Sequence, residues 1–243
     1  MAADVTKLMD TQSAALIFTD PPYNVDYEGH TKEKLKIKND KMDTDTFRAF
    51  LIDTFRNFYN VASPGAAIYI CHADSAGNEF REAMASANWT LKQCLIWVKN
   101  QFVIGRQDYQ WQHEPVLYGF LQNGKHPWYA DRKQTTIWNY DKPKRNANHP
   151  TSKPFDLLGY PIGNSSQENA IVIDTFGGSG STMMACEQMN RMCFTMELDE
   201  KYASVILRRA VENGIDPADI YVKRNGEKMM YSDLVKEVEI PDE

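Results

Sequence analysis

The chain has 243 residues, of which 42% are apolar and 25% are charged, with a net charge of −6. These proportions are ordinary for a globular protein, and the length suffices for one large domain with a substantial core. No apolar run approaches a membrane span and the N-terminus lacks a signal pattern, so we expect a cytoplasmic protein. Four cysteines without a CxxC pair favour buried, reduced thiols, and five scattered histidines give a metal site little support.

The first strong signal is ALIFTDPPYN, residues 15–24. An apolar run ends at Asp20 and breaks on Pro21 and Pro22, which exclude a continuing central strand and fix a turn. Because prolines lack a backbone N–H, the local carbonyls remain as acceptors. Asp20 and a neighbouring carbonyl can accept hydrogen bonds from an exocyclic amine, and Tyr23 offers a ring on which a base can stack.

The segments around this turn predict alternating helices and strands. If the base held at this turn belongs to DNA, the polar, lysine-rich segment 26–43 is a loop that closes on it; its composition also fits a solvated surface loop. The expected elements are a helix at 4–13, a strand ending near Asp20, an amphipathic helix at 45–60, a strand at 66–71, a helix at 75–87 and a strand at 92–98.

Residues 99–148 are the least regular part of the chain, although 113–120 predicts a buried strand. Aromatic residues alternate there with basic ones, a mixture suited to stacking on bases and neutralising phosphates. From Lys99 to Lys153 the net charge is +5, which leaves −11 for the rest of the chain. We therefore expect one DNA-facing surface, with contacts from Lys99, Arg106, Lys125, Arg132, Lys133, Lys142, Lys144 and Arg145.

The second strong signal is IVIDTFGGSGST, residues 171–182, where an apolar run ends at Asp174 and enters a glycine-rich turn. A buried strand, a glycine turn and a helix form the first unit of a ligand-binding α/β sheet, in which backbone N–H groups at the helix N-terminus face the ligand. The predicted strand 192–198 then places Glu197 20 residues after Gly177, suited to bind ribose hydroxyls. The pattern indicates an adenosine-bearing ligand.

The last segment of the chain predicts a helix and a hairpin. Asp199 can cap the helix, and Asn213–Gly214 can end it. Asn225–Gly226 lies between alternating residues, which is a strong hairpin signal.

DPPY at 20–23 and DTFGGSG at 174–180 together resemble the S-adenosylmethionine-dependent amino methyltransferases of DNA. DPPY resembles the adenine-N6 form, whereas the cytosine-N4 enzymes more often carry serine at the first position. The catalytic motif precedes the cofactor motif, which is similar to the family's permuted β arrangement. The resemblance covers nearly the whole chain, from about residue 4 to about residue 210.

The resemblance implies a Rossmann-like α/β fold of the class I methyltransferase type: an open, twisted, mostly parallel sheet with helices on both faces. It implies one catalytic domain over 1–243, with 99–148 as an inserted target-recognition segment. HPTSKP at 149–154 resembles the family's segment beside the methionine end of the cofactor, so Lys153 would pair with the cofactor carboxylate; without the two motifs, an ordinary start of a helix would explain it. The implied catalytic residues are Asp20, Pro21, Pro22 and Tyr23. The implied S-adenosylmethionine ligands are His149, Thr151, Lys153, Asp174, Phe176, Gly177, Gly178, Gly180, Ser181, Thr182 and Glu197, with no metal.

One departure from the family concerns the cofactor's adenine. The family usually has, before the helix at 4–13, a strand that ends in an acid contacting this adenine, and the chain begins too late to contain it. Asp4 is a poor substitute because it would begin the helix. We therefore expect either a trimmed sequence or an adenine that is held by other groups.

The expected reaction is methyl transfer to the N6 amine of an adenine flipped out of double-stranded DNA. In this hypothesis Tyr23 stacks on the base, while Asp20 and the Pro21 carbonyl accept hydrogen bonds from the amine. The alternatives are a cytosine-N4 enzyme, a non-catalytic DNA- or cofactor-binding module, an RNA or protein amine acceptor and, more weakly, a nicotinamide dehydrogenase, whose GxGxxG spacing is lacking. The oligomeric state is left open between monomer and homodimer.

Overall fold

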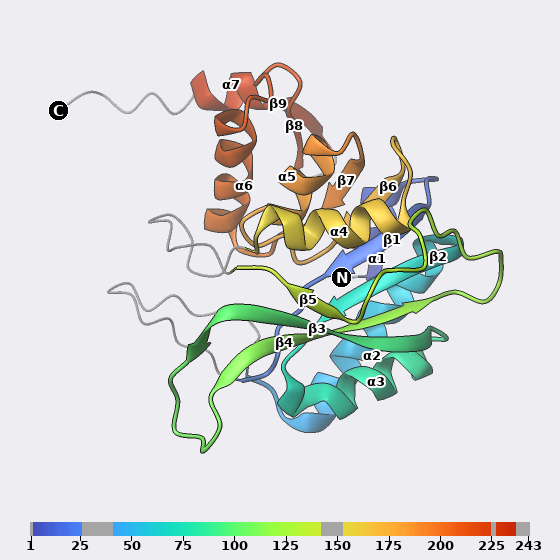
Figure 1. The fold of residues 1–243 in the computed structure, drawn as a ribbon. Helices are drawn as coiled ribbons and strands as arrows, with labels where there is room; N and C mark the ends of the chain where they lie inside the picture. Colours follow the sequence, from blue (N-terminus) through green and yellow to red (C-terminus); the bar gives the residue numbers. More distant parts are fainter. Residues whose placement is uncertain (1, 26–40, 142–152, 225–226, 237–243) are drawn as a thin grey trace.

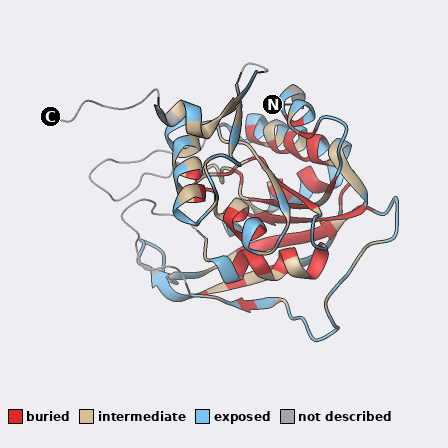
Figure 2. Cartoon of the chain, turned by 90° about the horizontal axis from the view of Figure 1, so that it is seen from above, coloured by how far each residue is buried: buried red, intermediate tan, exposed pale blue. Residues whose placement is uncertain are grey.

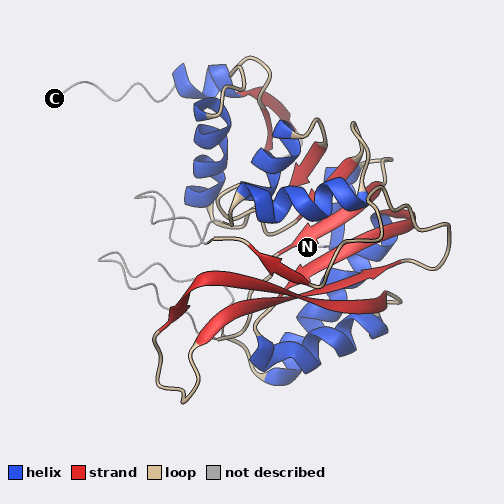
Figure 3. Cartoon of the chain, in the orientation of Figure 1, coloured by secondary structure: helices blue, strands red, loops and turns tan. Residues whose placement is uncertain are grey.

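The structure is a computed structural model that describes residues 2–25, 41–141, 153–224 and 227–236. It contains a seven-stranded sheet with helices on both faces (Figure 1, Figure 3). From edge to edge the strands are β5 (Ile137–Asn139), β3 (Thr90–Val103), β4 (Trp111–Phe120), β2 (Ala62–Cys71), β1 (Ala14–Thr19), β6 (Ile171–Asp174) and β7 (Met192–Thr195). Only β4 of these strands runs antiparallel to its neighbours. The predicted fold class, an open and mostly parallel α/β sheet, is confirmed.

The helices enclose two apolar layers, one on each face of the sheet. The first layer is covered by α1 (Ala2–Met9), α2 (Thr44–Val61) and α3 (Gly77–Ser86), with η1 (Asp74–Ala76) leading into α3. The second is covered by α4 (Phe155–Ser165) and α5 (Ser181–Gln188). The last helix of this part, α6 (Glu200–Glu212), packs through Ile206 against the turn before α5.

Alternation along the central strands explains why both faces are buried. In β1, Ile17 points into the first layer, whereas Leu16 and Phe18 point into the second. Figure 2 shows the buried residues concentrated on the central strands and on the inner sides of the helices. Continuous apolar strands of this kind are typical of parallel sheets covered on both sides.

The spacing of its phenylalanines makes α2 a core helix. Phe47, Phe55 and Phe58 are at most 2% exposed, and each buried ring stabilises the fold by roughly 1.5–3 kcal/mol. The helix begins at Thr44 because the Asp43 carboxylate accepts a hydrogen bond from the backbone N–H of Thr46 at 3.0 Å. The predicted helix over 45–60 is thus confirmed within a residue at each end.

Several strands differ in length from the prediction, and β2 begins at Ala62, four residues before the predicted start at 66. β3 continues five residues past the predicted end at 98, because β4 pairs with it as far as Val103↔Trp111. β7 ends at Thr195 instead of 198, because the chain then turns back toward the glycine turn. The carbonyl of Met196 accepts a hydrogen bond from the N–H of Gly177 at 2.8 Å, which draws this segment out of the sheet.

The two motif strands are neighbours. β1 and β6 run parallel, with Leu16 opposite Val172 and Ile17 opposite Ile173. Parallel neighbours present their carboxyl ends at the same edge, so the DPPY turn and the glycine turn emerge side by side.

The C-terminal segment forms the predicted hairpin, with β8 (Tyr221–Arg224) antiparallel to β9 (Glu227–Met230) and followed by α7 (Tyr231–Lys236). Its expected turn residues, Asn225–Gly226, lie outside the described residues. In the part of the chain that is described, none of the helices has the length and apolar character needed to cross a membrane.

Candidate active site

The two motifs line one small cavity at the carboxyl ends of β1 and β6. The cavity has a volume of about 60 Å³. Its lining residues are Phe18, Asp20, Lys153, Leu158, Asp174, Phe176, Gly177, Gly178, Ser179, Ser181 and Thr182. Residues 133 or more positions apart in the sequence therefore meet at the sheet edge where open α/β folds bind ligands.

Asp20 is the centre of a polar triad. The Tyr23 hydroxyl donates a hydrogen bond to Oδ1 of Asp20, and the Lys153 ammonium donates to Oδ2. The Lys153 side chain is only 9% exposed, while that of Asp20 is 35% exposed. The carboxylate is thus held by two fixed donors, yet remains open to the cavity.

Burial and the neighbouring carboxylates set the protonation states of this triad. Burial, followed by the charges of Asp20 and Glu114, raises the pKa of Tyr23 well above its usual value, so the phenol stays neutral. Burial alone lowers the pKa of Lys153, but the charges of Asp20 and Glu114 offset it and the pKa is raised. Lys153 is therefore a cation at neutral pH.

Asp174 lies beneath the glycine turn and is 3% exposed. Its carboxylate accepts hydrogen bonds from the Phe176 backbone N–H at 3.1 Å and from the Thr182 hydroxyl at 2.7 Å. Burial raises the pKa of Asp174 to about 6, although both hydrogen bonds act in the opposite direction. A cation in the cavity would therefore stabilise its ionised form.

The glycine turn needs glycine for two reasons. A side chain at Gly177 would place its Cβ 2.4 Å from Oγ1 of Thr195, so β7 leaves no room for one. Gly178 and Gly180 instead have φ values of +53° and +78°, in the left-handed region that favours glycine. At Gly178 the nearest atom to an added Cβ is 3.9 Å away, so space remains for a ligand to approach the backbone.

Two charged side chains hold this turn from outside the cavity. Glu197 accepts hydrogen bonds from the backbone N–H groups of Gly178 at 2.7 Å and Asp199 at 2.8 Å. Arg209 of α6 donates to the Ser179 carbonyl at 2.5 Å. Glu197 thus shapes the turn, and its predicted contact to a ribose would use the remaining lone pairs of its carboxylate.

A second ion pair lies beside the triad and corrects one prediction. Lys99 was expected to face DNA, but it is 8% exposed and paired with Glu114. Its ammonium also lies 5.0 Å from the centre of the Trp97 ring. A buried lysine that already has a carboxylate partner is not available for a phosphate.

The other predicted DNA contacts in the described residues do not all lie on one surface. Arg106 lies on the loop between β3 and β4 and is exposed, as are Arg132 and Lys133. The Lys125 backbone lies against Gly65 at the start of β2. This is the amino end of the parallel strands, whereas Asp20 lies at their carboxyl end. The described part of the chain therefore does not form the single basic surface that was expected. Five predicted site residues lie outside the described residues: Lys142, Lys144, Arg145, His149 and Thr151.

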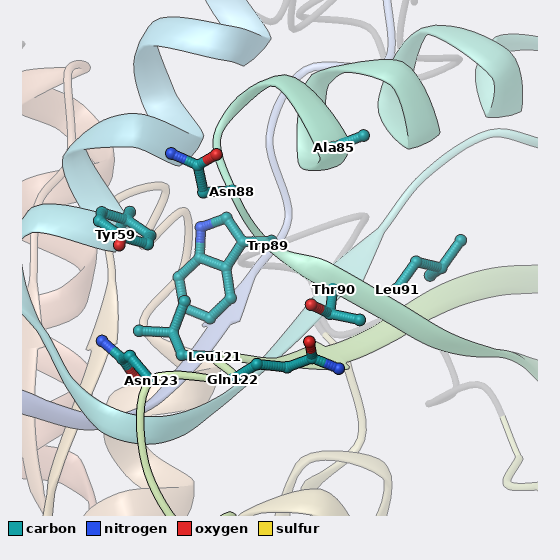
Figure 4. Close-up of a pocket in the computed structure, with 9 residues that line it drawn as sticks. All are labelled: Tyr59, Ala85, Asn88, Trp89, Thr90, Leu91, Leu121, Gln122 and Asn123. Carbon is teal, nitrogen blue, oxygen red and sulfur yellow. The ribbon is translucent and has the colours of Figure 1, made fainter.

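A larger hollow of about 640 Å³ lies at the opposite edge, between the ends of α2 and α3 and the start of β3 (Figure 4). Its lining includes the amides of Asn88, Gln122 and Asn123, and none of the nine lining residues is charged. It contains none of the predicted site residues, so the smaller cavity is the candidate site.

Sequence patterns missed the contacts made by Glu114, Thr195 and Arg209. No motif in the sequence marks Glu114, which lies 94 residues from Asp20 along the chain. Arg209 reaches the turn from a helix 30 residues further along the chain, and no local spacing marks such a contact. Only the hydrophobic period of 200–212, which directs one side of α6 toward the turn, gave an indirect signal.

Comparison with known proteins identifies the family. The profile of the N6 and N4 methyltransferases, described as DNA methylase, matches residues 14–208. The chain belongs to this DNA methylase family. The family uses S-adenosylmethionine as the methyl donor.

Individual relatives and solved structures are similar to this chain at low sequence identity. The DNA adenine methyltransferase YhdJ of Escherichia coli (strain K12) is 22% identical, over 84% of this chain and 78% of its own length. The structure of M1.HpyAVI in complex with SAM has a TM-score of 0.64 at 21% identity, covering 86% of this chain and 95% of that one. The cytosine-N4-specific PvuII DNA methyltransferase has a TM-score of 0.69 at 13% identity, covering 88% and 86%.

The residues of the cavity fit the reactive end of this cofactor. The charged lining groups are Asp20, Asp174 and Lys153, so ionised carboxylates exceed cations by one and favour a sulfonium cation. The open backbone at Gly178 allows close approach. Pockets that enclose a whole small molecule measure roughly 300–1,000 Å³. The described cavity is smaller and corresponds to the point where the two motifs meet.

Proposed function

We propose that this family member transfers a methyl group to the N6 amine of an adenine flipped out of double-stranded DNA. The observation that carries the proposal is the shared cavity. Asp20 of the DPPY turn and Gly178 of the glycine turn line the same 60 Å³ space, at the ends of two neighbouring parallel strands. A nitrogen held by the first turn therefore faces a methyl group held by the second.

The proposed cofactor ligands are the cavity residues Asp174, Phe176, Gly178, Ser181 and Thr182, with Glu197 beside them. When bound, S-adenosylmethionine supplies a methyl group on a sulfonium cation, which is open to direct displacement by an amine. No covalent enzyme intermediate is needed. Orientation and charge complementarity supply the acceleration.

Asp20 and the Pro21 carbonyl accept hydrogen bonds from the two N–H groups of the amine. They draw the nitrogen lone pair out of conjugation with the ring, and Asp20 lies where it can take up the proton released after the N–C bond has formed. The Tyr23 ring is half-buried, and its hydroxyl donates a hydrogen bond to Asp20. The uncovered face of the ring is the proposed stacking surface. Lys153 keeps a positive charge beside Asp20 and thereby holds it in the ionised form.

Adenine is favoured over cytosine by the DPPY form of the motif and by similarity to a relative named as a DNA adenine methyltransferase. Cytosine-N4 methylation is the second candidate, because the cytosine-N4-specific PvuII enzyme has the same fold. The two amines have similar chemistry, so the same triad would serve either base.

The test is incubation with isotope-labelled S-adenosylmethionine and plasmid DNA that lacks adenine and cytosine methylation, followed by mass spectrometry of the nucleosides. We expect labelled N6-methyladenine. Labelled N4-methylcytosine would support the mechanism but contradict the assignment of adenine as the target base. Cofactor binding without methyl transfer would favour a non-catalytic module, and label in added RNA or protein alone would move the acceptor away from DNA.

The catalytic assignment is tested by Asp20→Ala, with Asp45→Ala as the matched control because Asp45 is an exposed carboxylate on α2. We expect Asp20→Ala to bind S-adenosylmethionine and to lose methyl transfer, while Asp45→Ala keeps both. Undiminished transfer by Asp20→Ala would rule out the proposed role of this carboxylate.

A further inference from the structure

The hairpin between β3 and β4 extends beyond the sheet at the edge that carries Asp20. Pairing of β4 with β2 ends at Cys71↔Val116, whereas its pairing with β3 continues to Val103↔Trp111. At about 3.3 Å per residue, the five residues beyond Val116, from Pro115 to Trp111, project roughly 16 Å past β2. We call residues 100–112 the arm; it is the green hairpin at the lower left of Figure 1.

The base of the arm is joined to an ion pair whose charge reaches the polar triad of Asp20, Tyr23 and Lys153. Lys99 and Glu114 form the ion pair just below it, and the side-chain amide of Gln112 donates to the Lys99 carbonyl at 3.1 Å. The charge of Glu114 is close enough to contribute to the raised pKa values of Tyr23 and Lys153. The arm therefore stands beside the entrance that a target base must use.

The tip of the arm is shaped by a glutamine bridge. The Gln110 side chain accepts a hydrogen bond from the Gly105 N–H at 2.6 Å and donates one to the Gln107 carbonyl at 2.6 Å. These two bonds span the loop from 105 to 110 and hold its conformation. Ile104 and Tyr109 flank the bridge and point away from the protein, with exposed fractions of 84% and 92%.

These two side chains are the most exposed large apolar groups in the described part of the chain, and Phe102 and Trp111 behind them are 55% and 40% exposed. Four exposed large apolar side chains on one 13-residue hairpin form the kind of apolar surface that marks a binding site. Between 100 and 112 the only charged residues are Arg106 and Asp108, which cancel. Arg106 can meet one phosphate, but the arm has no net charge, and its four exposed apolar groups are suited instead to the apolar faces of bases.

From this geometry we propose that Ile104 and Tyr109 insert into the base stack of duplex DNA and fill the gap left by the flipped base. The inference rests on the proposed function, because it needs a DNA target. Apolar side chains are known to wedge between base steps and to offset the cost of unstacking. The fixed loop lowers the conformational entropy that insertion would otherwise cost.

The test compares two substrates that contain the methylation site mapped with the wild-type protein. One is a fully paired duplex, and in the other the target base stands opposite an abasic site and is already unpaired. The variant is Ile104→Ser with Tyr109→Ser. The matched control is Tyr221→Ser, a tyrosine that is 50% exposed on the separate β8–β9 hairpin, and Tyr109→Phe tests whether the ring alone suffices.

We expect the double variant to methylate the paired duplex roughly 10- to 100-fold more slowly, the scale of one or two lost stacking contacts, and the unpaired substrate nearly normally. Tyr221→Ser and Tyr109→Phe should match the wild type on both. Fluorescence of 2-aminopurine at the target position should rise with the wild type and not with the double variant. Unchanged S-adenosylmethionine affinity and thermal unfolding would show that the fold is intact.

Equal losses on both substrates, or no loss on either, would overturn the inference. A change in oligomeric state with an unchanged ratio between the substrates would also overturn it, and would assign the arm to protein contacts. Failure of the wild type to methylate any DNA would instead contradict the proposed function. The two failures are therefore distinguishable.

Discussion

The Lys153–Asp20 pair changes the interpretation of a single residue. The resemblance to the family placed Lys153 on the cofactor carboxylate, whereas the structure places its ammonium on Asp20. The two roles have different kinetic consequences. A ligand of the cofactor acts on the affinity for S-adenosylmethionine, while a positioning residue acts on the rate at saturating cofactor.

We expect Lys153→Met to lower the rate of methyl transfer at saturating S-adenosylmethionine by on the order of 100-fold, because a displaced carboxylate no longer aims the amine. Lys153→Arg should restore part of the rate because it retains the cation. Single-turnover assays and cofactor titration measure the two effects separately. A weaker cofactor affinity with an unchanged saturating rate would favour the cofactor-carboxylate role.

Asp174 makes the stability of the cofactor-free protein depend on pH. Its folded-state pKa of about 6 exceeds the ordinary 3.8, so folding favours the protonated carboxyl. The stabilisation is complete below pH 3.8 and is lost as the pH rises through 6. A difference of this size corresponds to about 3 kcal/mol.

Asp174→Asn removes this titration while keeping the side chain's shape. We expect the variant to gain stability relative to the wild type as the pH rises from 4.5 to 7.5, and to bind S-adenosylmethionine more weakly because one anion is lost. Urea unfolding at both pH values measures the first effect. The same difference in unfolding free energy at the two pH values would contradict the pKa assignment.

At the scale of elements, β7 and α6 pack against the glycine turn. Gly177 faces Thr195 of β7, and Gly180 faces Ile206 of α6. The Thr195 hydroxyl is buried and has no hydrogen-bond partner in the described structure, so it contributes little beyond the space it fills. The shape of the cofactor turn therefore depends on how closely these two elements pack.

Gly177→Ala should destabilise the fold by about 1–3 kcal/mol, because its Cβ would lie 2.4 Å from the Thr195 hydroxyl. Removing that hydroxyl with Thr195→Ala makes room for the methyl group. We expect the double variant to recover much of the loss, and chemical denaturation of the four proteins in a double-mutant cycle measures the coupling. Additive losses would show that the clash is relieved by backbone movement instead.

At the scale of the whole molecule, the basic residues that cluster along the sequence are spread apart in the fold. The basic segment 99–153 spreads over opposite edges of the sheet, with Arg106 on the arm and Lys125 beside Gly65. A duplex placed over the catalytic edge would contact the first and not the second. This separation makes Lys125 a control for Arg106.

We expect Arg106→Gln to weaken DNA binding and to reduce the slope of log affinity against log salt by about 0.9, the value for one phosphate contact. Lys125→Gln should leave both quantities unchanged. Fluorescence anisotropy with labelled duplex DNA at several salt concentrations measures them. A larger effect from Lys125→Gln would move the DNA surface to the opposite edge.

The sequence by itself determined the features that depend on local spacing. The period of the apolar residues predicted α2 and the central strands, and the two motifs predicted the ends of β1 and β6 and the glycine turn. These are local properties because an apolar period, a proline pair or a glycine run restricts the backbone wherever the chain lies. They were sufficient for the fold class and for the family.

Only the tertiary structure decided which distant groups meet. The contact of Lys153 with Asp20 spans 133 residues, and that of Arg209 with the turn spans 30. Such pairs follow from strand order and helix packing, which no local pattern encodes. The burial of Lys99 and the projection of the arm likewise depend on where β2 stops pairing with β4 while β3 continues. The composition of 99–153 predicted that Lys99 would contact DNA. In the folded sheet Lys99 is buried and paired with Glu114 instead.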